Sequence, residues 1–201
     1  MLLPVKKLRA IKQEIRIVGV DDGFFAPHTK GLADVIGVVY RGGYWLDGAM
    51  KTEVTIDGMD ATDKIAEMIM ASPHYAQLRI LMLNGVTFAG FNVVDIHKLS
   101  KLTALPVIAV TREKPNFSDI HKALTHLPDG DTRWKIIENA RALVSLRTRK
   151  GREPIYIQVA GISSEDAKRV VRESSTRSNV PEPLRVAHII ASGLTKASAK
   201  I

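Results

Sequence analysis

The sequence predicts a single α/β domain in which helices cover both faces of a mixed β-sheet. Across 201 residues, apolar runs of strand length alternate with segments of helical periodicity. The first three apolar runs are joined by short connections, which favours antiparallel pairing, whereas helices separate the later runs and favour parallel pairing. The length suits one domain, residues 1–201, with a sizeable core.

The three antiparallel strands are expected in the N-terminal part of the chain. An apolar run over residues 15–20 leads directly into two adjacent aspartates. The second strand is expected over residues 34–40, and the Gly-Gly pair that follows supplies the turn of a hairpin to a third strand over residues 44–56. Neighbouring side chains of a strand point to opposite faces, so at most one of the two aspartates can enter a shared site.

The rest of the chain alternates helices with short, buried strands. Ile65, Met68 and Ile69 share one face of a helix, and the run that ends at Asn84 is too apolar and too short for anything but a strand. The expected elements are a helix over 60–71, a strand over 79–83, a helix from about 92, a strand over 106–110, helices over 118–127 and 132–146, a strand over 154–159, and helices over 164–173 and 183–194. This order is the one expected of a three-layer RNase H-like fold, which does not by itself define a function.

Composition excludes several classes of protein. Cysteine is absent, so disulfides and thiolate metal sites are excluded, and a cytoplasmic location is expected. No apolar run approaches the ~20 residues of a membrane span. Aromatic residues make up only 5% of the chain, which argues against a surface built on base stacking.

The charge balance favours a polyanionic partner. The chain carries 29 basic and 21 acidic residues, for a net charge of +8. The excess is concentrated in a basic N-terminal arm, residues 1–14, and in residues 133–152, which contain Arg133, Lys135, Arg141, Arg147, Arg149, Lys150 and Arg152. Nucleic acid is the usual partner of such clusters, and a solvated helix face followed by a loop is the alternative.

Polar residues at the ends of strands predict a metal site. Asp21 or Asp22 ends the first strand, Asp57 ends the third and Asn84 ends the fourth. Mg²⁺ prefers oxygen ligands and is usually held by one or two carboxylates. We therefore expect Asp21, Asp57 and Asn84 to be catalytic, while a simple turn is the alternative for the two adjacent aspartates.

Two further aspartates are candidate metal ligands with a competing explanation. Asp60 and Asp95 each lie near the start of an expected helix, where a helix cap or a first-turn acid explains them well. The six histidines lack the spacing of metal ligands; among them, His97 and His188 are expected to be surface or core residues. The glycine-containing segment 85–90 has neither a P-loop lysine nor a dinucleotide-binding spacing.

Several motifs stand out along the chain. They are Gly19-Val20-Asp21, Asp57-Gly58-Met59-Asp60-Ala61-Thr62, Leu83-Asn84-Gly85, the continuation to Asn92, the run from Pro106 to Lys114, and the run from Pro181 to Ala187. These motifs resemble endonuclease V and, more closely, an archaeal endonuclease V-like family of unknown function, and the resemblance extends over about residues 15–195.

The resemblance implies an RNase H-like fold and a nuclease that uses Mg²⁺ or Mn²⁺. Endonuclease V hydrolyses a phosphodiester near a deaminated base, chiefly inosine. By this resemblance Asp21 matches the first metal-binding aspartate, and Asp57 or Asp60 falls where endonuclease V has an essential glutamate. Arg112 or Lys114 falls near its basic residue, and Arg185 lies in the last matching motif.

Two departures from endonuclease V bear on activity. Asn84 replaces an aspartate, and the lost charge should weaken metal binding unless Asp22, Asp60 or Asp95 takes over the role. The segment 44–51 lacks the Pro-Tyr-Ile-Pro wedge that separates DNA strands.

Three functions are therefore weighed. The first is a metal-dependent nuclease that acts on DNA or RNA, with Arg112, Lys114 and Arg185 contacting the nucleic acid. The second is a catalytically decayed protein that only binds nucleic acid. The third is an enzyme that acts on a small phosphorylated metabolite.

Overall fold

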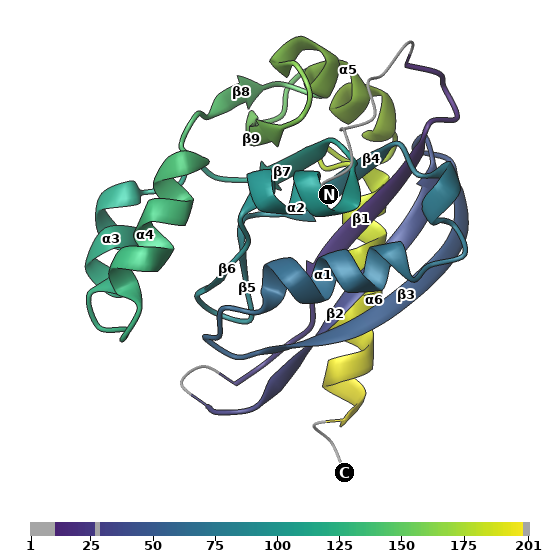
Figure 1. Ribbon diagram of the computed structural model, residues 1–201. Coiled ribbons are helices and arrows are strands. Elements are labelled where there is room, and N and C mark those ends of the chain that lie inside the picture. The colour runs from purple at the N-terminus through teal and green to yellow at the C-terminus, as the bar shows by residue number, and fades with distance from the viewer. Residues whose placement is uncertain (1–10, 27–28, 199–201) are drawn as a thin grey trace.

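A seven-stranded sheet forms the centre of the protein (Figure 1), which we describe from a computed structural model. The structure describes residues 11–26 and 29–198, with side chains to residue 194. The strands of the sheet lie in the order β3-β2-β1-β4-β7-β9-β8, and a two-stranded hairpin, β5-β6, stands apart. Their bounds are β1 Arg16–Asp22, β2 Leu32–Arg41, β3 Trp45–Thr55, β4 Ile80–Asn84, β5 Thr87–Phe88, β6 Asn92–Val93, β7 Val107–Thr111, β8 Val144–Leu146 and β9 Ile155–Ala160.

Helices cover both faces of the sheet, as predicted. Helices α1 and α2 pack on one face, while α5 and α6 pack on the other, and α3 and α4 form a hairpin beside the sheet (Figure 1). The helices are α1 Ala61–Met70, the short 3-10 helix η1 Tyr75–Gln77, α2 Ile96–Thr103, α3 Phe117–Leu124, α4 Gly130–Asn139, α5 Ser164–Ser174 and α6 Glu182–Ser198. Within the described residues, no helix has the length and apolar character needed to cross a membrane.

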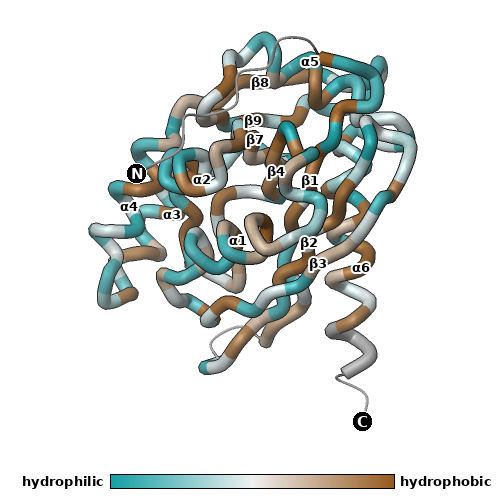
Figure 2. Tube along the Cα trace, turned by 45° about the vertical axis from the view of Figure 1, so that its right-hand side comes forward, coloured by the Kyte–Doolittle hydropathy of each residue, from teal (hydrophilic) through white to brown (hydrophobic). Residues whose placement is uncertain are grey.

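The side-chain alternation of β1 and β4 divides the core between the two faces. Val18, Val20 and Leu83 face α1 and α2, whereas Ile17 and Met82 face the side of α5 and α6. Figure 2 shows the resulting concentration of hydrophobic residues along the central strands. The same alternation continues through the polar residues at the ends of these strands. It therefore determines on which face of the sheet each acid lies.

Three parallel strands end at one edge of the sheet. β1 pairs in parallel with β4, and β4 pairs in parallel with β7, so Val20 lies beside Leu83 and Asn84 lies beside Val110. The carboxyl ends of parallel strands are the place where open α/β sheets bind ligands. This topology therefore brings the polar ends of β1, β4 and β7 together.

The predicted fold class is confirmed, and two element boundaries were wrong. The helix expected from about residue 92 begins at Ile96, because Asn92 and Val93 pair with β5 instead. The helix expected over 132–146 ends at Asn139, because Val144–Leu146 adds a strand to the edge of the sheet beside β9. The last two strands run antiparallel to their neighbours, and residues 1–10 of the predicted basic arm lie outside the described residues.

The start of α6 packs directly against β1 because residue 19 is a glycine. A Cβ atom at Gly19 would lie 2.5 Å from the carbonyl carbon of Pro183 and 2.6 Å from its oxygen, which no packed structure tolerates. Pro183 lies in the first turn of α6, where the missing amide costs little. This close approach holds α6 across the sheet and brings its residue His188 to the end of β1.

Candidate functional site

Asp21, at the end of β1, is the centre of the first polar cluster. Asn84, at the end of β4, donates a hydrogen bond from Nδ2 to Asp21 Oδ2 over 3.0 Å. His188 Nδ1, on α6, lies 2.9 Å from the same oxygen. We call these three residues the strand-end cluster. Asp21 and Asn84 face α6 because each lies an even number of residues from a side chain that packs there.

The electrostatics of Asp21 are unusual for a buried carboxylate. This residue is only 2% exposed, and none of the lysine and arginine side chains that the structure describes pairs with it. Burial raises the pKa of Asp21, while the hydrogen bond from Asn84 and the interaction with His188 act in the opposite direction. The imidazole of His188 carries a charge only when it is protonated, so the cluster lacks a permanent cation.

Asp22 points to the opposite face of the sheet. Its Oδ2 accepts a hydrogen bond of 2.6 Å from the backbone N–H of Ala89, in the turn of the β5-β6 hairpin. Burial raises the pKa of Asp22 to about 6, the Ala89 hydrogen bond lowers it, and the charge of Asp21 raises it. The two adjacent acids are thus separated by the strand, as strand geometry requires.

Asp57 belongs to a second polar cluster, between β3 and α1. Its Oδ1 accepts a hydrogen bond of 2.8 Å from the Phe91 N–H, and its own N–H donates to the Ala89 carbonyl over 2.9 Å. Asp57 and Ala89 both adopt positive φ angles, of 52° and 44°. Left-handed backbone at non-glycine residues stores strain and is found preferentially at functional sites.

Asp60 and Asp95 have structural partners. Asp60 accepts hydrogen bonds from the Thr55 N–H and hydroxyl and from Asn92 Nδ2. Burial raises the pKa of Asp60, but these hydrogen bonds outweigh it and hold the pKa below its ordinary value. Asp95 caps α2 by accepting from the N–H groups of His97 and Lys98, each at 2.9 Å. The sequence had offered capping as one of two explanations for Asp95.

Arg133 completes the second cluster and is one of its least expected members. From the sequence, Arg133 was grouped with the basic residues of the stretch 133–152, yet it is only 3% exposed. Its guanidinium donates to the carbonyl oxygens of Asp57, Gly58 and Phe91. We call Asp57, Asp60, Asn92 and Arg133 the loop cluster. Counting Arg133 in a basic cluster that is available to a polyanion was wrong, because its buried side chain donates to the carbonyl oxygens of this loop.

The predicted metal ligands are not brought together. Among the residues that the structure describes, no three His, Asp or Glu side chains form a group that could hold a metal ion. Around Asp21, the available donors are one carboxylate, the Asn84 amide oxygen and the His188 imidazole. Mg²⁺ is commonly held by one or two carboxylates, with water and substrate phosphates filling the remaining positions. The donors at Asp21 fit a cation that binds together with its substrate.

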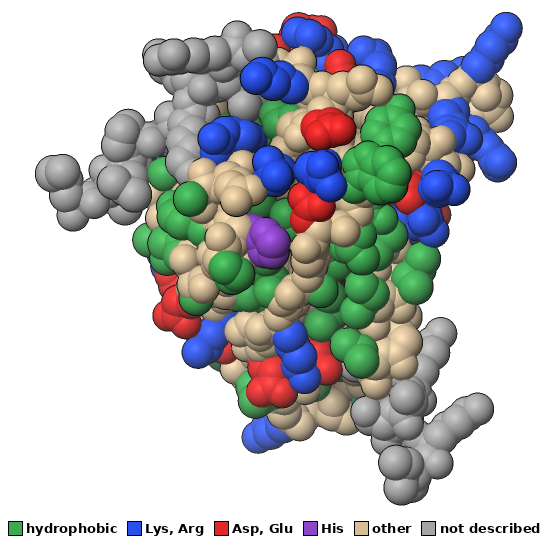
Figure 3. Space-filling view, turned by 90° about the vertical axis from the view of Figure 1, so that its right-hand side faces the viewer, with side chains coloured by type: hydrophobic (Ala, Val, Ile, Leu, Met, Phe, Trp, Pro, Cys, Tyr) green, Lys and Arg blue, Asp and Glu red, His purple; other side chains and the backbone are tan. Residues whose placement is uncertain are grey.

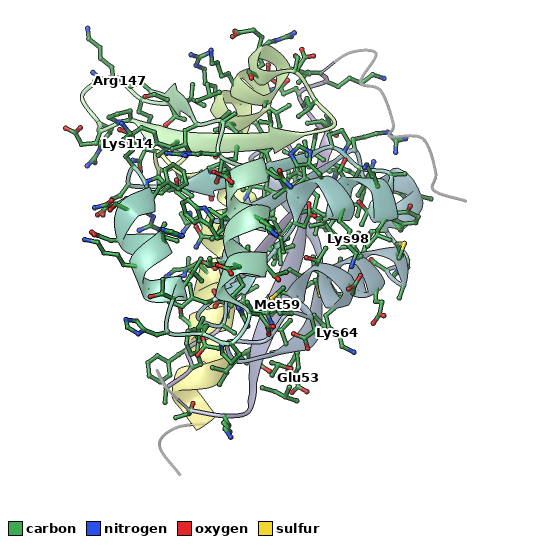
Figure 4. The ribbon with its side chains drawn as sticks, turned by 60° about the vertical axis from the view of Figure 1, so that its left-hand side comes forward. Glu53, Met59, Lys64, Lys98, Lys114 and Arg147 are labelled. Atoms are coloured by element: carbon green, nitrogen blue, oxygen red, sulfur yellow. The ribbon has the colours of Figure 1, made fainter. Side chains whose placement is uncertain are left out.

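Two predicted nucleic-acid contacts line a pocket at the edge of the sheet that carries the strand-end cluster. A pocket of about 540 Å³ lies at the ends of β4 and β7, and Gly85, Arg112 and Lys114 contribute to its walls. Both basic side chains are exposed, and Lys114 projects from this part of the surface in Figure 4. Gly85 directly follows Asn84, but Gln158 and Thr111, which also line the pocket, alternate with the side chains that face α5 and α6. The pocket therefore lies at the same edge of the sheet as the strand-end cluster, on the opposite face.

Arg185, the third predicted contact, has a partner within the protein. Its guanidinium binds both oxygens of Glu182 at 2.7–3.0 Å, and Glu182 is only 1% exposed. The hydrogen bonds from this carboxylate raise the pKa of Arg185. The ion pair neutralises a buried acid, so a nucleic-acid contact by Arg185 stays a prediction.

The remaining basic residues form an exposed surface at one end of the molecule. Arg147, Lys150 and Arg152 lie in or beside the loop between β8 and β9 and are exposed. Figure 3 shows lysine and arginine side chains gathered in the upper part of the molecule, where Figure 1 places α5 and the β8-β9 hairpin. This surface fits the polyanion predicted from the charge balance.

His188 and Arg133 are the residues that sequence reasoning missed. His188 was expected to be a surface or core residue, and 52% of its side chain is indeed exposed, but its ring contacts Asp21. A weak signal was present, because His188 directly follows Ala187, on the face of α6 that packs against the sheet. No local pattern distinguishes Arg133 from its basic neighbours.

The strand order and the helices on both faces give the protein an RNase H-like fold, as predicted. The fold is similar to that of Ciona intestinalis endonuclease V in complex with an inosine-containing DNA, with a TM-score of 0.61 at 14% identity over 92% of this chain and 87% of that chain. The chain belongs to the endonuclease dU family, whose model matches residues 13–195.

Relatives of this family match nearly the whole chain. A UPF0215 protein of Methanopyrus kandleri is 48% identical over 193 residues, which cover 96% of this chain and 98% of the relative. A crystal structure of a protein of unknown function from Archaeoglobus fulgidus has a TM-score of 0.80 at 38% identity, covering 90% of this chain and 98% of that chain. The family match and the structural similarity therefore both extend over nearly the whole chain.

Proposed function

We propose that this protein is an endonuclease that cleaves a phosphodiester of DNA at or near deoxyuridine, with Mg²⁺ or Mn²⁺. The observation that carries the proposal is Asp21, a buried carboxylate that lacks a lysine or arginine partner and lies between Asn84 and His188. Burying a carboxylate without a cation is costly, so such a group is retained where a ligand supplies the charge.

Asp21, His188 and the Asn84 amide oxygen would hold the metal ion. When bound, the ion would supply positive charge to the phosphate and lower the pKa of an attacking water. Arg112 and Lys114, exposed at the same edge of the sheet, would supply two further positive charges to the nucleic-acid backbone.

Two comparisons support DNA and deoxyuridine as the target. The matching family is described as endonuclease dU, a name that specifies both a nuclease and a deoxyuridine nucleotide. The similar endonuclease V from Ciona intestinalis is bound to DNA that contains a deaminated base. The exposed basic surface between β8 and β9 suits the DNA backbone outside the cleavage site.

A second function, binding without cleavage, is favoured by Asn84. The neutral amide brings no charge to a metal ion, and three acid or histidine ligands do not gather anywhere in the described part of the chain. A protein of this kind would bind DNA through its basic surface and dissociate at higher salt.

Cleavage of an end-labelled DNA that carries one deoxyuridine distinguishes the two functions. We expect nicking in Mg²⁺ or Mn²⁺, none in EDTA, and a loss of at least ~100-fold in the Asp21→Asn variant, which keeps the shape but removes the charge. Glu165→Gln, an exposed acid on α5, is the matched control and should cleave normally. Salt-dependent binding of the same DNA without any nicking by the wild type would establish the second function instead.

A further inference from the structure

A second pocket lies on the face of the sheet opposite Asp21, against the loop cluster. It has a volume of about 470 Å³ and is lined by Phe25, Asp57, Gly90, Phe91, His126 and Leu127. Pockets that bind small ligands fall between ~300 and 1,000 Å³ and combine apolar walls with a few polar groups. We call it the Asp57 pocket, because Asp57 is the only carboxylate among the described residues that line it.

We propose that the Asp57 pocket takes up one unpaired nucleobase and that Asp57 selects a base with a ring N–H, such as uracil. The proposal rests on the proposed function and names a residue that would distinguish uracil from cytosine. Enzymes that act at a base extrude it from the helix, stack it on aromatic or apolar side chains and read its Watson–Crick edge.

The walls of the pocket suit a flat, neutral ring. Phe25, Phe91 and His126 supply aromatic surface, and each stacked base gains ~1–3 kcal/mol in other proteins. Gly90 leaves the wall open, since a Cβ atom there would lie only 2.3 Å from Asp57 Oδ1. The pocket therefore depends on the absence of a side chain at residue 90.

Asp57 presents an acceptor to whatever enters the pocket. Its Oδ1 is engaged by the Phe91 N–H, whereas Oδ2 accepts no hydrogen bond from the described residues. A carboxylate reads N–H donors only. Deamination of cytosine replaces the lone pair at ring position N3 with an N–H, so uracil donates to Asp57 at the position where cytosine would repel it.

The buried guanidinium of Arg133 makes the pocket select a neutral ligand. Arg133 donates to the backbone carbonyls of Asp57 and Phe91 and forms no ion pair with a carboxylate of the described residues. Its positive charge lies directly behind Asp57 and offsets the charge of that carboxylate. An amine or another cation would gain little in this pocket, whereas a neutral N–H donor keeps its full hydrogen bond.

The backbone couples the pocket to the strand end that carries Asp21. Ala89 donates its N–H to Asp22 and accepts from the Asp57 N–H, so one residue joins the pocket to the end of β1. Asp21 lies on the other side of that strand end.

Binding without metal separates this proposal from the proposed cleavage. Fluorescence anisotropy in EDTA compares labelled single strands of deoxyadenosine that carry one deoxyuridine, one deoxycytidine or one N3-methyldeoxyuridine. The wild type should bind the deoxyuridine strand about tenfold more tightly than the other two, the effect of one hydrogen bond to a charged acceptor.

Two variants test the residues of the pocket. Asp57→Asn should lose the preference for deoxyuridine and keep its affinity for the deoxycytidine strand, and asparagine tolerates the left-handed backbone at this position. Phe91→Ala should weaken binding of the deoxyuridine strand. The control Asp63→Asn changes an exposed acid on α1 that pairs with Lys98, and it should bind as the wild type does.

Each outcome bears on one proposal only. If Asp57→Asn keeps the preference, or the wild type has none, the pocket proposal is overturned even if the protein nicks deoxyuridine DNA. If the preference depends on Asp57 and nicking is absent, the pocket is supported and the proposed cleavage fails.

Discussion

The strand-end cluster and the loop cluster carry acids on opposite faces of the same sheet. The two clusters shift the pKa of Asp21 and the pKa of Asp60 in opposite directions. Burial raises the pKa of Asp21, and its partners are the side chains of Asn84 and His188 and the backbone N–H of Asp22. Hydrogen bonds lower the pKa of Asp60, three of them from Thr55 and Asn92. The loop cluster stabilises the ionised form of Asp60, whereas the strand-end cluster leaves Asp21 short of positive charge.

This difference teaches that burial does not by itself identify a functional acid. Hydrogen bonds to the charged form lower a pKa, while desolvation raises it. An acid whose partners satisfy its charge contributes to stability, and one whose partners do not is a candidate to bind a ligand. Substitutions in the two clusters should therefore have opposite effects on stability.

The largest effect is expected at Arg133, in the loop cluster. Arg133→Met keeps much of the side-chain volume but leaves the carbonyls of Asp57, Gly58 and Phe91 without donors in a buried site. We expect a loss of about 3 kcal/mol in the free energy of unfolding, measured by urea denaturation. Lys135→Met, an exposed residue of the same helix, is the control; equal stability of the two variants would show that the loop does not depend on Arg133.

A smaller loss is expected where α6 meets the sheet. Gly19→Ala places a Cβ atom against the backbone of Pro183, which cannot move without shifting α6. Overpacking of this kind costs ~1–3 kcal/mol, and the displaced helix should also weaken cleavage because it carries His188. Urea denaturation and the deoxyuridine nicking assay measure the two effects. A variant with normal stability and activity would show that the close approach does not position His188.

Asp60 should contribute stability that depends on pH. Asp60→Asn removes the charge that Thr55 and Asn92 stabilise, and we expect a loss of ~1 kcal/mol at neutral pH, reduced by solvent because the carboxylate is partly exposed. The folded pKa lies below the ordinary value of 3.8, so this contribution is present above about that pH and is lost as the pH falls through the folded pKa. Unfolding curves at neutral and acidic pH should converge for the wild type and the variant; a constant difference would contradict the assignment.

The smallest effect on stability, and the one of opposite sign, is expected at Asp21. Asp21→Asn relieves the desolvation of a charged group and keeps a polar side chain beside Asn84, so the free energy of unfolding should stay the same or rise by up to ~1 kcal/mol. The nicking activity should be lost in the same variant. A clear loss of stability would place Asp21 with the structural acids and remove the contrast between the two clusters.

Much of the fold followed from local patterns. Short connections predicted the antiparallel pairing of β1, β2 and β3, and apolar runs bounded by turn residues predicted β4 and β7. The two wrong boundaries were at Asn92 and at Val144, where a residue run with acceptable helical character forms a strand. Strand pairing at an edge or in a hairpin is a tertiary event, so local propensity does not decide it.

The candidate site was only partly predictable. Asp21, Asp57 and Asn84 were selected because polar residues follow apolar strands, and the structure places Asp21 and Asn84 in contact. The separation of Asp57 from Asp21 was not foreseen, because it depends on the course of the β5-β6 hairpin between them. Asp57 and Phe91 lie 34 residues apart along the chain, and no spacing rule connects them.

The sequence by itself determined the order of the strands and helices, the family, and the acids and amide at the strand ends, because each of these depends on neighbouring residues or on motifs. Only the tertiary structure decided that His188 joins Asp21, that Arg133 is buried behind Asp57 and that the two acid clusters lie on opposite faces. The physical reason is that a carboxylate's charge is set by the partners that folding brings to it, and those partners come from distant parts of the chain.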